Sequence, residues 1–71
     1  MTNIQKVRIA DGIRFIVSLS FRSGLDYKEA QIAMIAVIEL MRELDEGRDS
    51  EEMLALLIEK VIDREGERLG L

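Results

Sequence analysis

The sequence contains no cysteine, histidine, proline or tryptophan, and only three aromatic residues. Without cysteine no disulfide can form, and without cysteine and histidine the usual ligands of structural zinc are missing. Small domains commonly contain disulfides or metal sites, because their cores alone contribute only about 3–5 kcal/mol to the free energy of unfolding. Since 48% of the residues are nonetheless apolar, we expect a single domain over residues 1–71 that is stabilised by association, as a homodimer.

Signatures of several functional classes are absent as well. The chain has no Gly-rich phosphate loop, no nucleophile beside a base and no metal-binding spacing, so we expect no enzymatic activity, no cofactor and no metal. Its longest uninterrupted apolar run is Ile32–Ile38, seven residues, whereas a membrane span needs about 20. No signal-peptide pattern follows Met1. These absences are typical of a cytoplasmic protein that has no contact with membranes.

Charge is present but unevenly distributed. The net charge of −4 combines +3 over residues 1–22 with −7 over residues 23–71. A basic head on an acidic body tells more about binding partners than the overall isoelectric point of about 4.7 does.

Residues 26–46 have the pattern of a long helix. Asp26 and Glu29 have the spacing of a capping box, and Gly47 stands where a helix commonly ends. Apolar residues recur at helical spacing on two adjacent stripes, which predicts burial on more than one side. We expect the dimer interface on this helix, at Ile32, Met34, Ile35, Ile38 and Met41.

A second helix is predicted over residues 49–65. Asp49 or Ser50 can begin it, and Glu52 lies three residues after Asp49. The apolar stripe consists of Met53, Leu54, Leu57, Ile58, Val61 and Ile62. Because Gly47 and Arg48 form a short connection, the two helices should pair as an antiparallel hairpin.

Residues 4–22 alternate with a period of two, which is typical of β-strands. Apolar residues occupy the odd positions Val7, Ile9, Ile13, Phe15, Val17, Leu19 and Phe21. Asp11-Gly12 is a strong hairpin signal, and a three-residue turn at Ala10-Asp11-Gly12 keeps one face apolar and the other basic, with Ile16 as the exception. The pattern therefore predicts an α+β fold in which an N-terminal β-hairpin precedes two antiparallel helices.

The alternative is an all-α protein with three helices. Ile4, Val7, Ile13, Ile16, Val17 and Ser20 would then form an apolar stripe, although a ragged one. Gly12 would lie inside this helix at a cost of about 1 kcal/mol.

The even positions of the predicted hairpin suggest a nucleic-acid-binding face. Its candidate residues are Lys6, Arg8, Arg14, Ser18, Ser20 and Arg22. A β-ribbon can enter the major groove of double-stranded DNA, where such side chains reach bases and phosphates. The opposing interpretation is a solvated face that protects strand edges from aggregation. The sequence thus predicts a small DNA-binding regulator of the antitoxin or repressor kind, or alternatively an acidic protein-interaction module such as an inhibitor or adaptor.

One local pattern resembles a known family. DEGRDSEEMLALLIEKVIDRE, residues 45–65, resembles the second helix of ribbon-helix-helix DNA-binding proteins and the Gly-Arg turn before it. With IRFIVSLSFR as the strand, the resemblance covers about residues 13–65. It implies a strand that pairs with its twin in a dimer and reads the major groove through Arg14, Ile16, Ser18, Ser20 and Arg22.

Overall fold

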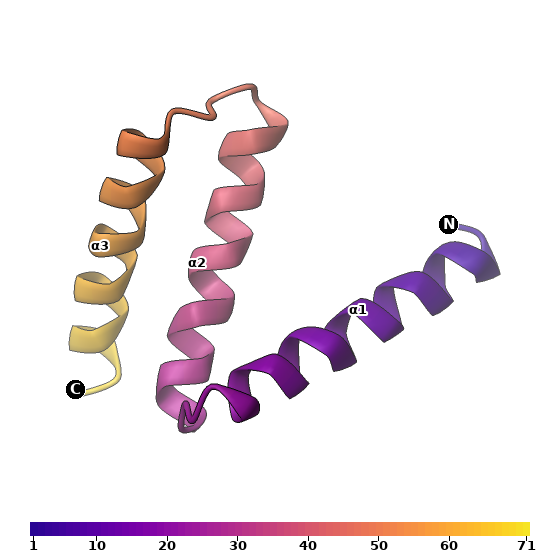
Figure 1. The fold of residues 1–71 in the computed structure, drawn as a ribbon, viewed down its shortest axis with the longest axis horizontal. Coiled ribbons are helices and arrows are strands. Elements are labelled where there is room, and N and C mark those ends of the chain that lie inside the picture. Colours follow the sequence, from indigo (N-terminus) through magenta and orange to yellow (C-terminus); the bar gives the residue numbers. More distant parts are fainter.

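The computed structural model describes all residues 1–71 as three helices joined by short turns (Figure 1). Helix α1 comprises Asn3–Arg22, α2 comprises Tyr27–Asp45 and α3 comprises Glu51–Arg68. No strand is present. The fold is therefore all-α, as the three-helix alternative predicted.

The β-hairpin predicted for residues 4–22 is wrong. This segment is the helix α1, which continues through Gly12. An isolated two-stranded ribbon is at best marginally stable in water, whereas a helix satisfies its backbone hydrogen bonds within one segment. The single cost of Gly12, about 1 kcal/mol, does not outweigh that difference.

Both ends of α1 have clear capping motifs. Thr2 and Gln5 form a capping box, in which each side chain accepts a hydrogen bond from the other residue's backbone N–H. At the other end the N–H of Gly24 donates to the carbonyl of Phe21 and the N–H of Leu25 donates to that of Ser20. This pair of bonds is a Schellman motif, and Gly24 has the positive φ of 78° that the motif requires.

Helices α2 and α3 form the antiparallel hairpin that the sequence predicted (Figure 1). The capping box of Asp26 and Glu29 is confirmed, with Asp26 as the N-cap of α2. Of the two predicted starts of α3, Ser50 is confirmed as the N-cap, although its side chain makes no capping bond, and the box of Asp49 and Glu52 does not form. Helix α3 also continues past residue 65 to Arg68.

The core lies between α2 and α3 and is small. Only four apolar residues are buried, namely Ala30, Ile32, Ala36 and Val61. The Nη2 of Arg64 on α3 donates a hydrogen bond to the Oε2 of Glu39 on α2, at a distance of 2.7 Å. At the open end of the hairpin the Lys28 ammonium donates to the Leu69 carbonyl at 3.1 Å. Because few apolar side chains are buried between α2 and α3, these polar contacts add to the stability of the helix pair.

Helix α1 projects away from this hairpin (Figure 1). It packs against α2 alone, near the turn that joins them. The radius of gyration is 13.8 Å, where a compact chain of this length has about 11 Å. The accessible surface is 5830 Å², compared with about 4,500 Å² for a compact monomer of this mass. One chain alone therefore leaves about 1,300 Å² more surface in water than its size requires.

Gly12 provides a test of the helical state of α1. Its φ is not positive, and a Cβ built there meets nothing within 4 Å. Gly12→Ala should therefore raise the free energy of unfolding by about 0.5–1 kcal/mol, because alanine loses less backbone entropy in a helix. Urea denaturation followed by circular dichroism at one fixed protein concentration measures the change.

Gly24→Ala is the matched control for this substitution. A Cβ at Gly24 also meets nothing within 4 Å, but the φ of 78° is left-handed, which costs an L residue about 1–2 kcal/mol. We expect this variant to be destabilised by that amount. A hairpin turn at Asp11-Gly12 would instead require glycine at position 12, so a loss of stability in Gly12→Ala would contradict the helix.

Candidate protein-interaction surface

An open groove of about 790 Å³ runs between α2 and α3. Nine of its thirteen lining residues are hydrophobic. The apolar residues that line it are Leu25, Ile32, Ala33, Ala36, Val37, Leu40, Ile58, Ile62 and Leu71. Helix α2 contributes two alanines and three larger aliphatic residues to the lining, and α3 contributes Ile58 and Ile62. The groove is an apolar channel that the chain itself does not fill.

The polar residues along this groove are acidic. Glu29, Asp63 and Glu67 line it, and no cation does. The Glu29 carboxylate accepts the hydrogen bond of the Asp26 capping box. Asp63 and Glu67 are exposed and form no ion pair. The groove therefore favours an apolar occupant that carries positive charge at its edges.

A second hollow, of about 250 Å³, lies where α1 meets α2. It is lined by Ile16, Leu19, Ser20, Ser23, Leu25, Ala33, Met34 and Val37. Leu25, Ala33 and Val37 line both this hollow and the groove. The two depressions are consequently parts of one continuous apolar surface that extends from α3 across α2 to α1.

The surface continues outward along α1 as a stripe of isoleucines. Ile9, Ile13 and Ile16 are exposed and lie on one side of the helix at spacings of three and four residues. By the 100° rotation per residue, Lys6 and Arg8 lie on either flank of this stripe. Both cations are exposed and form no ion pair. Helix α1 thus carries an apolar stripe with basic borders.

The candidate DNA-binding residues all lie on α1, but the helix does not gather them on one face. Arg14, Ser18 and Arg22 follow one another at i, i+4 and i+8 on one side, whereas Lys6 and Ser20 lie on other sides. Arg14 pairs with Asp11 at 3.2 Å. Ser20 is buried, and its hydroxyl donates to the Ile16 carbonyl at 3.1 Å. The predicted ribbon face is wrong, because no ribbon forms. On the helix, Arg8 falls on the same side as Arg14, Ser18 and Arg22, within an arc of about 120° at 100° per residue.

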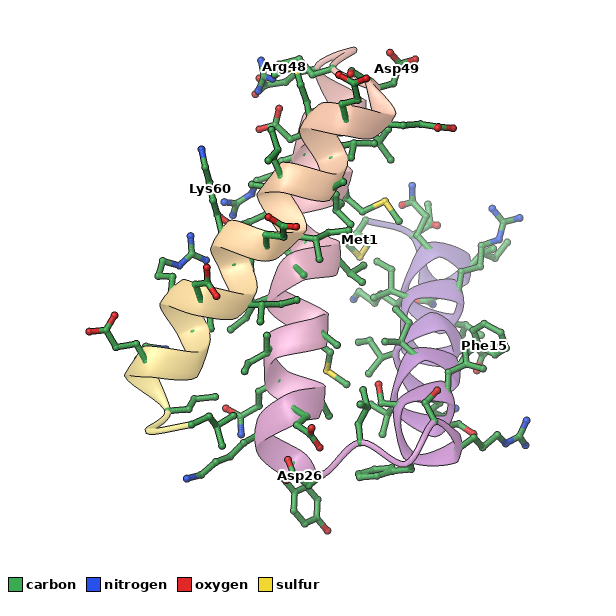
Figure 2. The ribbon with its side chains drawn as sticks, turned by 60° about the vertical axis from the view of Figure 1, so that its left-hand side comes forward. Met1, Phe15, Asp26, Arg48, Asp49 and Lys60 are labelled. Atoms are coloured by element: carbon green, nitrogen blue, oxygen red, sulfur yellow. The ribbon has the colours of Figure 1, made fainter.

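Phe15 projects from α1 away from the hairpin (Figure 2). It is exposed, like Val7 and Ile4. Large apolar side chains thus occur on more than one side of α1. The stripe of Ile9, Ile13 and Ile16, together with Leu19, joins the surface that leads to the groove.

The residues predicted for the dimer interface on α2 separate into three environments. Ile32 is buried and lines the groove. Met34 and Ile35 are half-buried, and Met34 lines the hollow beside α1. Ile38 and Met41 are exposed. Sequence reasoning therefore found part of the apolar surface. It placed Ile58 and Ile62 on the apolar stripe of the second helix but not at an interface, and it did not single out Leu71.

The ion pairs of the hairpin serve its own packing. Glu65 is buried between Arg64 and Arg68, and the hydrogen bond from Arg68 holds the pKa of its carboxyl below the ordinary value. Arg48 at the turn pairs with Glu43 and Glu46, and its hydrogen bond lowers the pKa of Glu43 in the same way. These carboxylates stay ionised near neutral pH. Each is engaged by an arginine, so neither is placed to act as an acid or base.

The structure shows no assembly suited to holding a metal ion, since no three potential ligands gather in one place. None of its helices combines the length and apolar character that crossing a membrane would require.

Comparison with known proteins adds no information about the function of this chain, which is therefore inferred from the geometry of the surface. No family model, no curated protein and no solved structure matches this chain.

Proposed function

We propose that this chain is an acidic protein-interaction module of the cytoplasm, an adaptor or inhibitor that works as a homodimer and does not bind nucleic acid. The observation that carries the proposal is the continuous apolar surface formed by the groove and the stripe on α1. Its chemistry is that of helix packing, because its walls are aliphatic and its borders are charged.

The extent of the exposed apolar surface supports association with protein. Monomeric soluble proteins rarely expose contiguous apolar patches above a few hundred Å². Here eighteen large hydrophobic residues are exposed, while only four apolar residues are buried. A protein partner that presents apolar helices would remove this surface from water, whereas duplex DNA offers mainly phosphates and polar base edges.

DNA binding through the N-terminal cations stays a competing prediction. In its favour, Lys6, Arg8 and Arg22 are exposed and form no ion pair. Against it, Lys6 lies on a different side of α1 from Arg8, Arg14 and Arg22, and the body they are attached to carries a net charge of −7. An acidic body repels the phosphate backbone, which dominates the affinity of proteins for DNA.

A gel shift at low salt separates the two functions. We expect micromolar protein to retain no duplex DNA. Retention that weakens steeply as salt rises, with a smaller salt dependence in Arg14→Ala or Arg22→Ala, would contradict the proposal. Lys28→Ala is the matched control, because Lys28 is an exposed cation of the acidic body that bonds the Leu69 carbonyl and its loss should leave the result unchanged.

A further inference from the structure

We infer that the groove between α2 and α3 binds helix α1 of a second copy of the chain, and that the exchange is reciprocal. This inference rests on the proposed function and names the partner of its surface. Each copy would supply one isoleucine stripe and one groove, so that the dimer contains the same contact twice.

The position of the two surfaces supports a symmetric pairing. Leu25, Ala33 and Val37 belong to both depressions, so the stripe and the groove lie on one continuous surface of each copy. A two-fold axis that places one stripe on the partner's groove therefore also places the partner's stripe on the first groove. A surface of this kind is complementary to itself, as an isologous interface must be.

The dimensions of the two surfaces are compatible. Along α2 the groove is lined from Glu29 to Leu40, which is about 16 Å at 1.5 Å per residue. The stripe from Ile9 to Ile16 rises about 10 Å along α1. The stripe is thus short enough to lie within the groove, while the rest of α1 extends beyond it.

The charges of the two surfaces are complementary. Asp63 and Glu67 border the groove without ion-pair partners, and Lys6 and Arg8 flank the stripe without partners. In the wider sequence the segment 1–22 has a net charge of +3 and the remainder −7. Opposite charges at the borders steer two copies together and fix their orientation.

The area that must be covered also favours a second copy over a foreign helix. Removing the excess of about 1,300 Å² from each of two copies would bury about 2,600 Å² in total, within the range of about 2,000–5,000 Å² for obligate homodimers. A single foreign helix in the groove would cover Ile58 and Ile62 but leave Ile9, Ile13 and Ile16 in water.

The turn between α1 and α2 disfavours closure of α1 onto its own groove. The Schellman motif at Gly24 ends α1, and the capping box of Asp26 begins α2 two residues later. Every residue of this turn is therefore part of a hydrogen-bonded cap, and no flexible residue remains as a hinge. The caps instead hold α1 outward, where it can reach another copy (Figure 1).

Two neighbouring residues of α1 provide the first test. Ile9 is 49% exposed in the stripe, and Val7 is 59% exposed on the opposite side of the helix. Ile9→Asn should raise the dimer dissociation constant about a hundredfold or more, because each dimer loses two buried isoleucines. Val7→Asn, the control, should leave it within about threefold. Sedimentation equilibrium measures both, and equal effects of the two substitutions would overturn the inference.

Charge exchange provides the second test. The variants Lys6→Glu/Arg8→Glu and Asp63→Lys/Glu67→Lys each place like charges at both contacts of their own homodimer, so each should dissociate at least about tenfold more readily than wild type. Mixed in equal amounts, they regain opposite charges at both contacts. Native mass spectrometry should then show a heterodimer of near wild-type affinity. Neither variant opposes its own helix dipole, since acids are added near the start of α1 and cations near the end of α3.

The outcomes separate this inference from the proposed function. A wild-type chain that stays monomeric at micromolar concentration would overturn the exchanged dimer, and so would a dimer that is indifferent to Ile9→Asn and to the charge variants. The second result would leave the interaction module in place with a different interface. DNA retention in the gel shift would instead overturn the proposed function whatever the dimer does.

Discussion

Val61→Asp is expected to abolish the pairing of α2 and α3 and with it most of the helix content. Val61 is 0% exposed and is the only large side chain that is completely buried. A carboxylate there would lose its hydration without gaining a partner, which costs several kcal/mol. A core of this size supplies only about 3–5 kcal/mol. The substitution therefore removes the whole stability of the hairpin, and circular dichroism at 25 °C should show a largely unfolded chain.

Leu56→Asp is the matched control for this prediction. Leu56 lies five residues earlier on α3, faces the opposite side of the helix and is 57% exposed. The same carboxylate would stay hydrated there, so helix content and the urea midpoint should remain near the wild-type values. Equal loss of structure in both variants would show that α3 does not pack through the side that bears Val61.

The hairpin of α2 and α3 could be predicted because its local and long-range signals agree. Asp26 and Glu29 mark the beginning of α2, Gly47 marks its end, and apolar residues between them recur at helical spacing. A short turn then leaves an antiparallel pair as the only simple arrangement. The end of α3 was less predictable, because Gly66 suggests fraying while Arg64 and Arg68 hold the last turns through ion pairs to Glu39 and Glu65.

Helix α1 was mispredicted because its apolar residues satisfy two periods at once. Alternation of Val, Ile and Phe around Asp11-Gly12, broken only at Ile16, has the appearance of a hairpin, yet Ile9, Ile13 and Ile16 also fall on one side of a helix. The deciding signals lie at the ends. Thr2 and Gln5 have capping-box spacing, and Ser23-Gly24 stands where a helix can close. A helix needs only these local bonds, whereas a ribbon needs another layer to cover it.

The interaction surface could be predicted only in part for the same reason. Periodicity identified the apolar stripes of residues 26–46, so Ile32 and Met34 were among the expected contacts. The groove itself arises from the spacing of α2 and α3, and the direction of α1 arises from the turn at Gly24. Both are properties of three-dimensional packing that no single segment encodes.

Unfolding of the wild-type protein should depend on its concentration. In the proposed dimer a second copy covers the apolar surface that one chain leaves in water, which couples folding to association. For a dimer that unfolds to two chains, hundredfold dilution lowers the apparent stability by about 2.7 kcal/mol. For a cooperative unit of two chains this corresponds to a fall in Tm of about 5–10 °C.

Thermal unfolding followed by circular dichroism across this concentration range measures the effect. Val7→Asn should show the same dependence as wild type, since Val7 lies outside the stripe. Ile9→Asn should have a lower Tm than wild type at every concentration in this range, because its weakened dimer is less stable against dissociation and unfolding. A wild-type Tm that is constant over the hundredfold range would contradict coupled folding. It would mean that four buried apolar residues and the ion pairs of the hairpin suffice to hold one chain together.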